Sequence, residues 1–116
     1  MNTHEEYMEL ALEEARKAEE IDEVPVGCII VCDGEIIARG HNLKEQLNQA
    51  YAHAEMMTIQ KAAEVKGNWC LNDCDLYVTL EPCMMCTGII NLSRIRTVYY
   101  GTTDPKGGCL ETVIDL

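Results

Sequence analysis

The sequence predicts an α/β domain, with four strands in one sheet and helices packed against it. Two patterns carry this prediction. One is an Asp-Gly dipeptide between two β-rich runs, which is a strong signal for a hairpin. The other is the order strand, helix, strand over residues 75–100, which is typical of a parallel crossover unit.

Residues 3–20 are predicted to form an amphipathic helix. Thr3 and Glu6 have the spacing of a capping box, in which the threonine accepts from the N3 amide and the glutamate reaches back. Apolar residues recur at helical spacing along the segment: Tyr7, Leu10, Ala11, Ala15 and Ala18. Pro25 stops any continuation of the helix.

A β-hairpin is predicted next. The runs 26–32 and 35–39 are apolar and β-rich, and Asp33-Gly34 joins them. Glycine accepts the positive φ of a type I′ turn, so the two runs should pair as antiparallel strands. The polar residues 40–50 are predicted to form a loop.

The chain should then alternate between helices and strands. A second helix is expected from near residues 51–52 to about 65, where the Lys-Gly-Asn sequence at 66–68 ends it. The strand 75–80, the helix 82–92 and the strand 95–100 follow, and together they form the crossover unit.

The whole chain, residues 1–116, is predicted to be one domain. A chain of this length can bury roughly two-thirds of the surface that its unfolded form exposes. No repeat, linker or low-complexity stretch interrupts it. Residues 102–108 are predicted to form a loop, and residues 109–116 could open a last helix.

Composition excludes wholesale disorder, a membrane-spanning chain and a secreted disulfide framework. Apolar residues make up 47% of the chain and charged residues 25%, as in ordinary globular domains. No apolar run approaches the roughly 18 residues of a membrane helix. The N-terminus shows no secretory signal. The cysteine count is seven, an odd number, so we expect reduced thiols and a cytoplasmic location.

The negative charge is concentrated at one end of the chain. The net charge is −11, and the first 23 residues carry nine acidic and two basic residues, a net of −7. Such a run usually marks a solvated helix face. No basic stripe of the sort that binds phosphates strongly is present.

Three short segments carry the chemistry. His53-Ala54-Glu55 is followed about thirty residues later by Pro82-Cys83 and by Cys86. This is the H-x-E … P-C-x-x-C arrangement of zinc-dependent nucleobase deaminases.

One imidazole and two thiolates, from His53, Cys83 and Cys86, suit Zn²⁺. Three protein ligands leave the fourth tetrahedral position for water, and zinc lowers the pKa of that water from about 15.7 toward 7, which gives hydroxide. Glu55 is expected to lie beside the open position. There it would take the proton of the water and deliver it to a ring nitrogen and then to the leaving amine.

Other interpretations of these residues remain open. A lone histidine at a helix start is usually a surface or capping residue. A lone C-x-x-C pair can be redox-active or half of a structural zinc site, which Cys70 or Cys74 would then close. The glutamate two residues after the histidine has no role in such a closed site. Core or surface thiols are the simpler interpretation of Cys28, Cys32 and Cys109.

Further motifs extend over residues 23–116. They are Val24-Pro25-Val26-Gly27, Gly40-His41-Asn42, Ala52-His53-Ala54-Glu55, Asn68-Trp69, the run from Leu76 to Cys86, Ser93-Arg94-Ile95, Tyr100-Gly101 and Asp104-Pro105-Lys106. With these motifs the sequence resembles the bacterial tRNA-specific adenosine deaminases of the zinc-dependent cytidine and deoxycytidylate deaminase superfamily.

The resemblance implies a cytidine-deaminase-like, three-layer α/β/α fold with a central mixed sheet, here shortened at the C-terminus. It implies one catalytic Zn²⁺ per subunit and hydrolytic deamination of adenosine to inosine at the tRNA wobble position or in another single-stranded nucleic acid. The target base would be extruded into the pocket. By position, the resemblance assigns substrate contacts to Asn42, to the backbone at Ala54 and to Asp104. From the residues alone, Asn42 could equally be a turn residue after Gly40.

The resemblance also implies a homodimer. The helix 82–92 has more apolar positions than one sheet-facing stripe requires: Met84, Met85, Ile89, Ile90 and Leu92. The strand 95–100 could be an uncovered edge. We therefore expect the helix 82–92 at or beside the interface and the acidic first helix outside it.

Two other functions compete with deamination in tRNA. The same metal site serves deaminases of a free base or nucleoside, such as guanine or cytosine. The acidity of the chain favours them, whereas the run from Leu76 to Cys86 favours deamination in tRNA. A non-catalytic zinc-binding module is the other alternative, and the presence of Glu55 and of three ligands argues against it.

Overall fold

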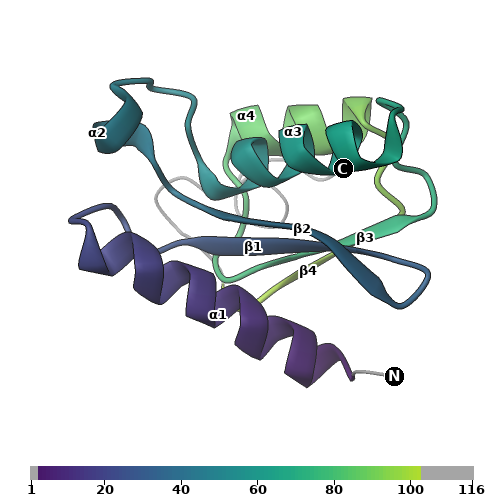
Figure 1. Cartoon of the computed structure of the whole chain (residues 1–116), viewed down its shortest axis with the longest axis horizontal. Helices are drawn as coiled ribbons and strands as arrows, with labels where there is room; N and C mark the ends of the chain where they lie inside the picture. The colour runs from purple at the N-terminus through teal and green to yellow at the C-terminus, as the bar shows by residue number, and fades with distance from the viewer. Residues whose placement is uncertain (1–2, 103–116) are drawn as a thin grey trace.

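The computed structural model describes residues 3–102, which contain a four-stranded mixed sheet (Figure 1). Strand β1 (Gly27–Cys32) pairs antiparallel with β2 (Glu35–His41) on one side and with β3 (Cys74–Val78) on the other. Strand β4 (Thr97–Tyr100) pairs parallel with β3, so the order is β2-β1-β3-β4. Within the described residues, β2 and β4 are the edges of this sheet.

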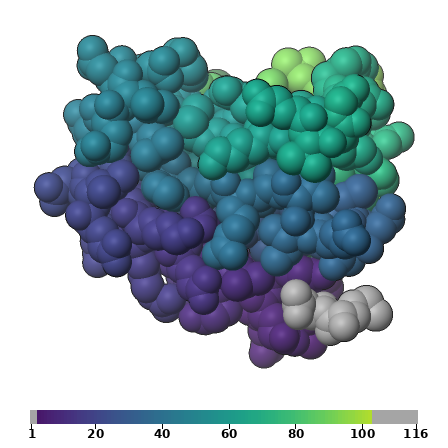
Figure 2. Space-filling view, viewed as in Figure 1, coloured from purple at the N-terminus to yellow at the C-terminus, as the bar shows by residue number. Residues whose placement is uncertain are grey.

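Helices cover both faces of the sheet, which confirms the three-layer α/β/α prediction. Helix α1 (His4–Glu20) lies on one face, while α3 (Ala54–Lys66) and α4 (Met84–Leu92) lie side by side on the other (Figure 1). The short helix α2 (Lys44–Leu47) precedes α3. Figure 2 shows the same layering, with α1 in purple along the bottom and α3 in green along the top.

The alternation of side chains along the strands produces two buried clusters, one on each side of the sheet. Cys28 and Ile30 of β1 face the cluster that α3 and α4 complete. Ile29 and Val31 point the other way and pack with Tyr7 of α1. The sheet is therefore buried on both faces, as its run of apolar residues predicts.

The predicted N-terminal helix and its capping box are confirmed. The Thr3 hydroxyl accepts from the Glu6 backbone N–H at 3.2 Å, and the Glu6 carboxylate accepts from the Thr3 N–H at 3.1 Å. These bonds satisfy two of the otherwise unpaired donors at the start of α1.

One buried carboxylate attaches α1 to the sheet. The side chain of Glu14 accepts from Lys17 on its own helix at 2.7 Å and from two residues of β2, Arg39 at 3.1 Å and His41 at 2.9 Å. Only 3% of Glu14 is exposed. These three hydrogen-bonding partners offset the free-energy cost of burying a charged carboxylate.

The predicted hairpin is confirmed at its turn. Asp33 has φ 51° and Gly34 has φ 81°, the two positive values of a type I′ turn. The β2 strand continues to His41, two residues further than predicted.

The loop predicted over residues 40–50 is wrong in part, because α2 lies inside it. No side chain of its own caps this helix. Instead the carboxylate of Glu23 accepts from the backbone N–H groups of Glu45 at 3.0 Å and Gln46 at 2.7 Å. A partner 22 residues away stabilises the turn of helix, so local sequence does not reveal it.

The crossover unit β3–α4–β4 is confirmed, with shorter elements than predicted. Helix α3 begins at Ala54, two or three residues later than predicted, because His53 is extended with φ −78° and ψ 158°. Gly67 ends that helix in the left-handed region, as expected. The predicted helix 109–116 lies outside the described residues. Among residues 3–102, no helix has the length and apolar character needed to cross a membrane.

Candidate active site

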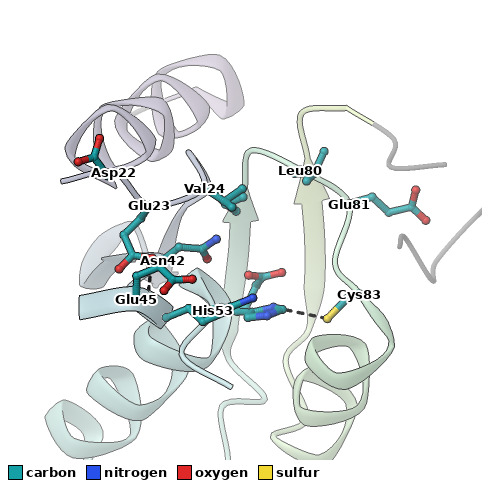
Figure 3. A pocket seen from close by; sticks show the side chains of 12 residues that line it. Asp22, Glu23, Val24, Asn42, Glu45, His53, Leu80, Glu81 and Cys83 are labelled. Carbon is teal, nitrogen blue, oxygen red and sulfur yellow. Dashed lines mark hydrogen bonds between the residues drawn. The ribbon is translucent and has the colours of Figure 1, made fainter. Parts of the chain in front are cut away.

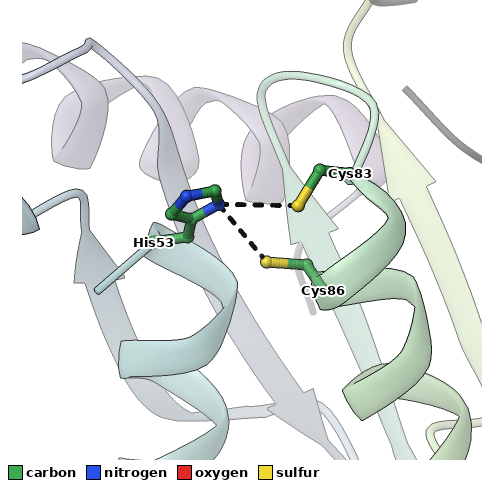
Figure 4. A group of neighbouring side chains, drawn as sticks. All are labelled: His53, Cys83 and Cys86. Atoms are coloured by element: carbon green, nitrogen blue, oxygen red, sulfur yellow. Dashed lines mark hydrogen bonds between the residues drawn. The ribbon is translucent and has the colours of Figure 1, made fainter. Parts of the chain in front are cut away.

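The three residues expected to bind metal come together between α3 and α4 (Figure 4). His53 is the N-cap residue of α3 and Cys83 is the N-cap residue of α4, and neither side chain makes a capping hydrogen bond. Cys86 lies in the first turn of α4 and is fully buried. The two sulfur atoms each lie 3.6 Å from Nδ1 of His53.

These distances fit a shared zinc ion. Zinc–nitrogen and zinc–sulfur bonds of about 2.05 and 2.3 Å at a tetrahedral angle place the nitrogen and sulfur about 3.6 Å apart. One imidazole and two sulfur atoms are also the donor types that zinc prefers. His53, Cys83 and Cys86 therefore form a group able to hold the metal.

The helix start around Cys83 favours a thiolate. The side chain of Cys86 and the backbone N–H groups of Cys86 and Met85 donate to the Cys83 sulfur, and His53 adds a favourable charge interaction. Despite partial burial, these contacts lower the pKa of Cys83 to about 5. The site thus has at least one thiolate ready to bind a cation at neutral pH.

Glu55 is a buried carboxyl beside this group. It is 4% exposed, interacts with Cys86 and lines the same pocket as His53 and Cys83. Burial, with a contribution from the charge of Cys83, raises the pKa of Glu55 to about 7. A carboxyl with such a pKa can both accept and donate a proton near neutral pH.

The pocket in front of the group has a volume of about 290 Å³ (Figure 3). Five of the side chains that line it are acidic: Asp22, Glu23, Glu45, Glu55 and Glu81. Among the described residues, Lys44 is the one lysine or arginine in the lining. The cavity therefore suits a neutral ring that carries hydrogen-bond donors better than it suits a phosphate.

Asn42 lines the pocket and also caps a helix. Its side-chain oxygen accepts from the backbone N–H of Ala54 at 2.7 Å, which satisfies the first donor of α3. Its amide nitrogen has no hydrogen-bond partner among residues 3–102. The alternative interpretation of Asn42 as a turn residue predicts neither its position in the pocket lining nor its hydrogen bond to Ala54.

Of the other two predicted substrate contacts, only Ala54 lies within the described residues. Ala54 is fully buried, and its N–H is taken by Asn42. Asp104 lies outside the described residues. The alternative in which a fourth cysteine closes the metal site has no support within residues 3–102. Cys74 belongs to a separate group with Cys32 and Asp73, and Cys70 belongs to neither group.

Sequence reasoning missed Glu23. This residue is buried, lines the pocket and holds α2 at the pocket wall through its two backbone hydrogen bonds. Its position before the Val-Pro-Val run was the only sequence signal, and nothing in that signal points to residues 45 and 46.

Comparison with known proteins places the chain in a family. The family model of the cytidine and deoxycytidylate deaminase zinc-binding region matches residues 1–102. The tRNA-specific adenosine deaminase of Bacillus subtilis is 52% identical over 116 residues, which are all of this chain and 72% of that protein. The Agrobacterium fabrum protein of the same name is 54% identical over 106 residues, 91% of this chain and 70% of the relative. The Streptococcus pyogenes protein is 50% identical, and the chain spans 64% of its length.

Solved structures agree with these relatives. One comes from structural studies of A-to-I editing by tRNA:A34 deaminases at the wobble position; it has a TM-score of 0.91 and 53% identity, over 93% of this chain and 83% of that one. The guanine deaminase of Bacillus subtilis has a TM-score of 0.85 and 40% identity, over 89% of this chain and 66% of that one. The chain therefore belongs to the cytidine and deoxycytidylate deaminase zinc-binding family, in the group of the tRNA-specific adenosine deaminases.

Proposed function

We propose that the chain is a zinc-dependent hydrolytic deaminase that converts adenosine to inosine in tRNA, at the wobble position, or in another single-stranded nucleic acid. The observation that carries the proposal is a group of three metal-binding side chains with a buried, protonatable carboxyl beside it at one pocket. The similarity to tRNA-specific adenosine deaminases at about half of all positions supports the choice of substrate.

The metal site consists of His53, Cys83 and Cys86, with one zinc per subunit. Zinc held by three protein ligands supplies Lewis acidity, which makes water nucleophilic at neutral pH. The chain's contribution is to hold two helix starts at the spacing that a tetrahedral ion needs.

Glu55 is the catalytic residue in this proposal. It accepts a proton from the attacking water and delivers it to N1 of the purine ring, and a second transfer protonates the amine that leaves C6. The raised pKa of Glu55 supports this role, because the same group must accept and release a proton at one pH.

The base is positioned by the pocket walls. The free amide hydrogens of Asn42 donate to an acceptor on the ring, while its oxygen stays bonded to Ala54. Ala54 helps to position the base because it is the first residue of α3. Asp104 contacts the backbone of the substrate. Since the lining is acidic, only the extruded base enters, and the phosphates remain outside.

We further propose a homodimer with α4 at or beside the interface. Met84 is 60% exposed and Leu92 is 69% exposed, and Met85 is also exposed. Burying these side chains against a second copy stabilises the pair. Light scattering at micromolar concentration should give the mass of two chains, and Met84→Glu should shift the mass toward one.

The location that fits this function is the cytoplasm, and one domain carries the whole site. The described cysteines are free, as expected in a reducing compartment. The part of the chain that matches the deaminase family model, residues 1–102, contains all four residues assigned to zinc and proton transfer.

A free-base deaminase is the second candidate, because a guanine deaminase is 40% identical to this chain. The test is ammonia release from the purified full chain with tRNA, short single-stranded DNA, adenosine, guanine and cytosine, with inosine measured in the tRNA. Turnover of tRNA alone supports the proposal, and turnover of guanine alone assigns the second candidate. If the chain binds zinc but turns over none of these substrates, the result favours a non-catalytic zinc-binding module.

A further inference from the structure

A second group of sulfur and oxygen atoms lies at the other end of β1 from the pocket. The side chains of Cys32, Asp73 and Cys74 come within 4.8 Å of one another. Cys32 is the last residue of β1, whereas Val26, just before that strand, lines the pocket. The proposed deamination uses none of these three side chains.

Cys32 and Cys74 are direct neighbours across the antiparallel pair β1–β3. At the far end of this ladder the Thr79 N–H donates to the Gly27 carbonyl at 3.0 Å, and hydrogen-bonded and non-hydrogen-bonded pairs alternate from there. Cys32–Cys74 is thereby a non-hydrogen-bonded pair. In such a pair the Cα atoms are about 4.5 Å apart, inside the range of about 4.4–6.8 Å that a disulfide requires.

We propose that Cys32 and Cys74 are a redox-modification site, a dithiol that closes reversibly into a cross-strand disulfide when it meets a disulfide oxidant such as oxidised glutathione. The Cys32 thiolate attacks one glutathione sulfur and releases one glutathione. The Cys74 thiolate then attacks the Cys32 sulfur and releases the second. The chain loses two electrons and two protons, and the oxidant becomes two glutathione thiols.

The surroundings assign the attack to Cys32. Cys32 is partly exposed and Cys74 is fully buried, so the oxidant reaches Cys32 first. The Lys66 ammonium lies 3.7 Å from the Cys32 sulfur and favours its thiolate. The buried Cys74 is already beside Cys32 and serves as the resolving thiol.

Asp73 restrains the pair. Its carboxylate accepts from the Cys32 thiol at 3.3 Å and from the Cys74 thiol at 3.4 Å. Burial and then these hydrogen bonds raise the pKa of Cys32, and they raise the pKa of Cys74 to about 12. Asp73 also forms an ion pair with Lys66, so a divalent cation would have to displace an ammonium group from the carboxylate. The geometry therefore favours a disulfide over a metal site.

The test is oxidation of the folded full chain, as isolated with its metal, by oxidised glutathione, followed by peptide mapping without reduction. We expect a linked Cys32–Cys74 peptide and a chain mass lower by roughly 2 Da. The link should disappear with dithiothreitol and in Cys32→Ser. It should persist in Cys70→Ser, the matched control for a partly exposed thiol four residues from Cys74.

The rate of closure tests the roles of the neighbours. A lower thiol pKa raises the thiolate fraction more than it lowers nucleophilicity, so each pKa unit should accelerate closure about threefold. Asp73→Asn should therefore speed closure, and Lys66→Met should slow it. Three results would overturn the proposal. One is a glutathione adduct at Cys32 that never gives way to the Cys32–Cys74 disulfide, and another is a mixture of disulfides between many cysteine pairs like that formed in denaturing urea. The third is a second zinc ion per chain that protects both thiols from oxidation.

Discussion

The side-chain oxygen of Asn42 accepts a hydrogen bond from the backbone N–H of Ala54, at 2.7 Å. The bond joins the end of β2 to the start of α3, directly beside the histidine of the candidate metal site. The side chain of Asn42 therefore has two roles, because its oxygen stabilises the helix start and the residue lines the pocket.

The two roles of the Asn42 side chain can be separated by mutation. Asn42→Asp keeps the oxygen acceptor and removes the amide donor, whereas Asn42→Ala removes both. We expect Asn42→Ala to lower the free energy of unfolding by about 1 kcal/mol, the usual value of a lost cap. Asn42→Asp should keep most of the stability and raise KM. Thermal unfolding and steady-state kinetics on both variants provide the measurement, and an unchanged KM in Asn42→Asp would argue against substrate contact.

Glu55→Gln should keep zinc and lose activity. The amide cannot shuttle a proton, and a positioned acid–base group contributes about 10²–10⁴-fold in rate. The measurement is kcat together with metal content. His53→Ala is the matched comparison two residues earlier: it should lose zinc and also stability, because metal binding is coupled to folding. Loss of zinc in Glu55→Gln would mean that the carboxylate is a ligand instead of a proton shuttle.

Glu23→Ala should loosen α2 and the pocket wall. It removes both backbone hydrogen bonds to residues 45 and 46, and we expect a cost of about 0.5–2 kcal/mol, as for the loss of a helix N-cap. We expect faster hydrogen exchange at the amides of Glu45 and Gln46 and a higher KM. Glu20→Ala, an exposed acid near the same turn, is the control and should change neither. Unchanged exchange in Glu23→Ala would show that α2 forms without this carboxylate.

Glu14 should make the fold sensitive to acid. Burial alone raises the pKa of Glu14, but the hydrogen bonds from Lys17 and His41 and the charge of Arg39 outweigh it and lower the pKa below 4.5. The contribution of Glu14 to stability is therefore present above pH 4.5 and is lost as the pH falls through the lower, folded-state pKa. Urea unfolding between pH 6 and pH 3 should show a steeper loss for the wild type than for Glu14→Gln. Parallel curves would rule out this role.

Local signals in the sequence predicted the elements whose determinants lie within a few residues. The Asp33-Gly34 turn and the Thr3–Glu6 capping box are of this kind, since the turn needs two neighbouring positive φ angles and the capping box needs two hydrogen bonds three residues apart. The spacing of His53, Cys83 and Cys86 predicted the metal group because ligand chemistry restricts the residue types. The resemblance to known deaminases added the layer order of the fold.

Features that depend on distant partners could not be predicted in this way. Helix α2 forms because the carboxylate of Glu23, in another segment, accepts hydrogen bonds from its backbone. The polar residues of α2 by themselves predict a loop. The pairing of Cys32 with Cys74 depends on strand register, which no single segment contains. Helix α3 begins later than predicted because the backbone at His53 is extended to aim its ring at the two sulfur atoms.

The acidic helix α1 lies on the face of the sheet opposite α3 and α4, which carry the candidate metal ligands (Figure 1). That face repels a polyanionic substrate before the two make contact. The repulsion extends over about a Debye length, which is 8 Å at physiological salt. Collisions through the α1 face are thereby suppressed, and the orientation of the encounter is biased before any contact forms. Most proteins lose affinity for nucleic acids as salt rises, because Lys and Arg contacts release counterions. With a net charge of −11, this chain should instead associate faster when moderate salt screens the repulsion.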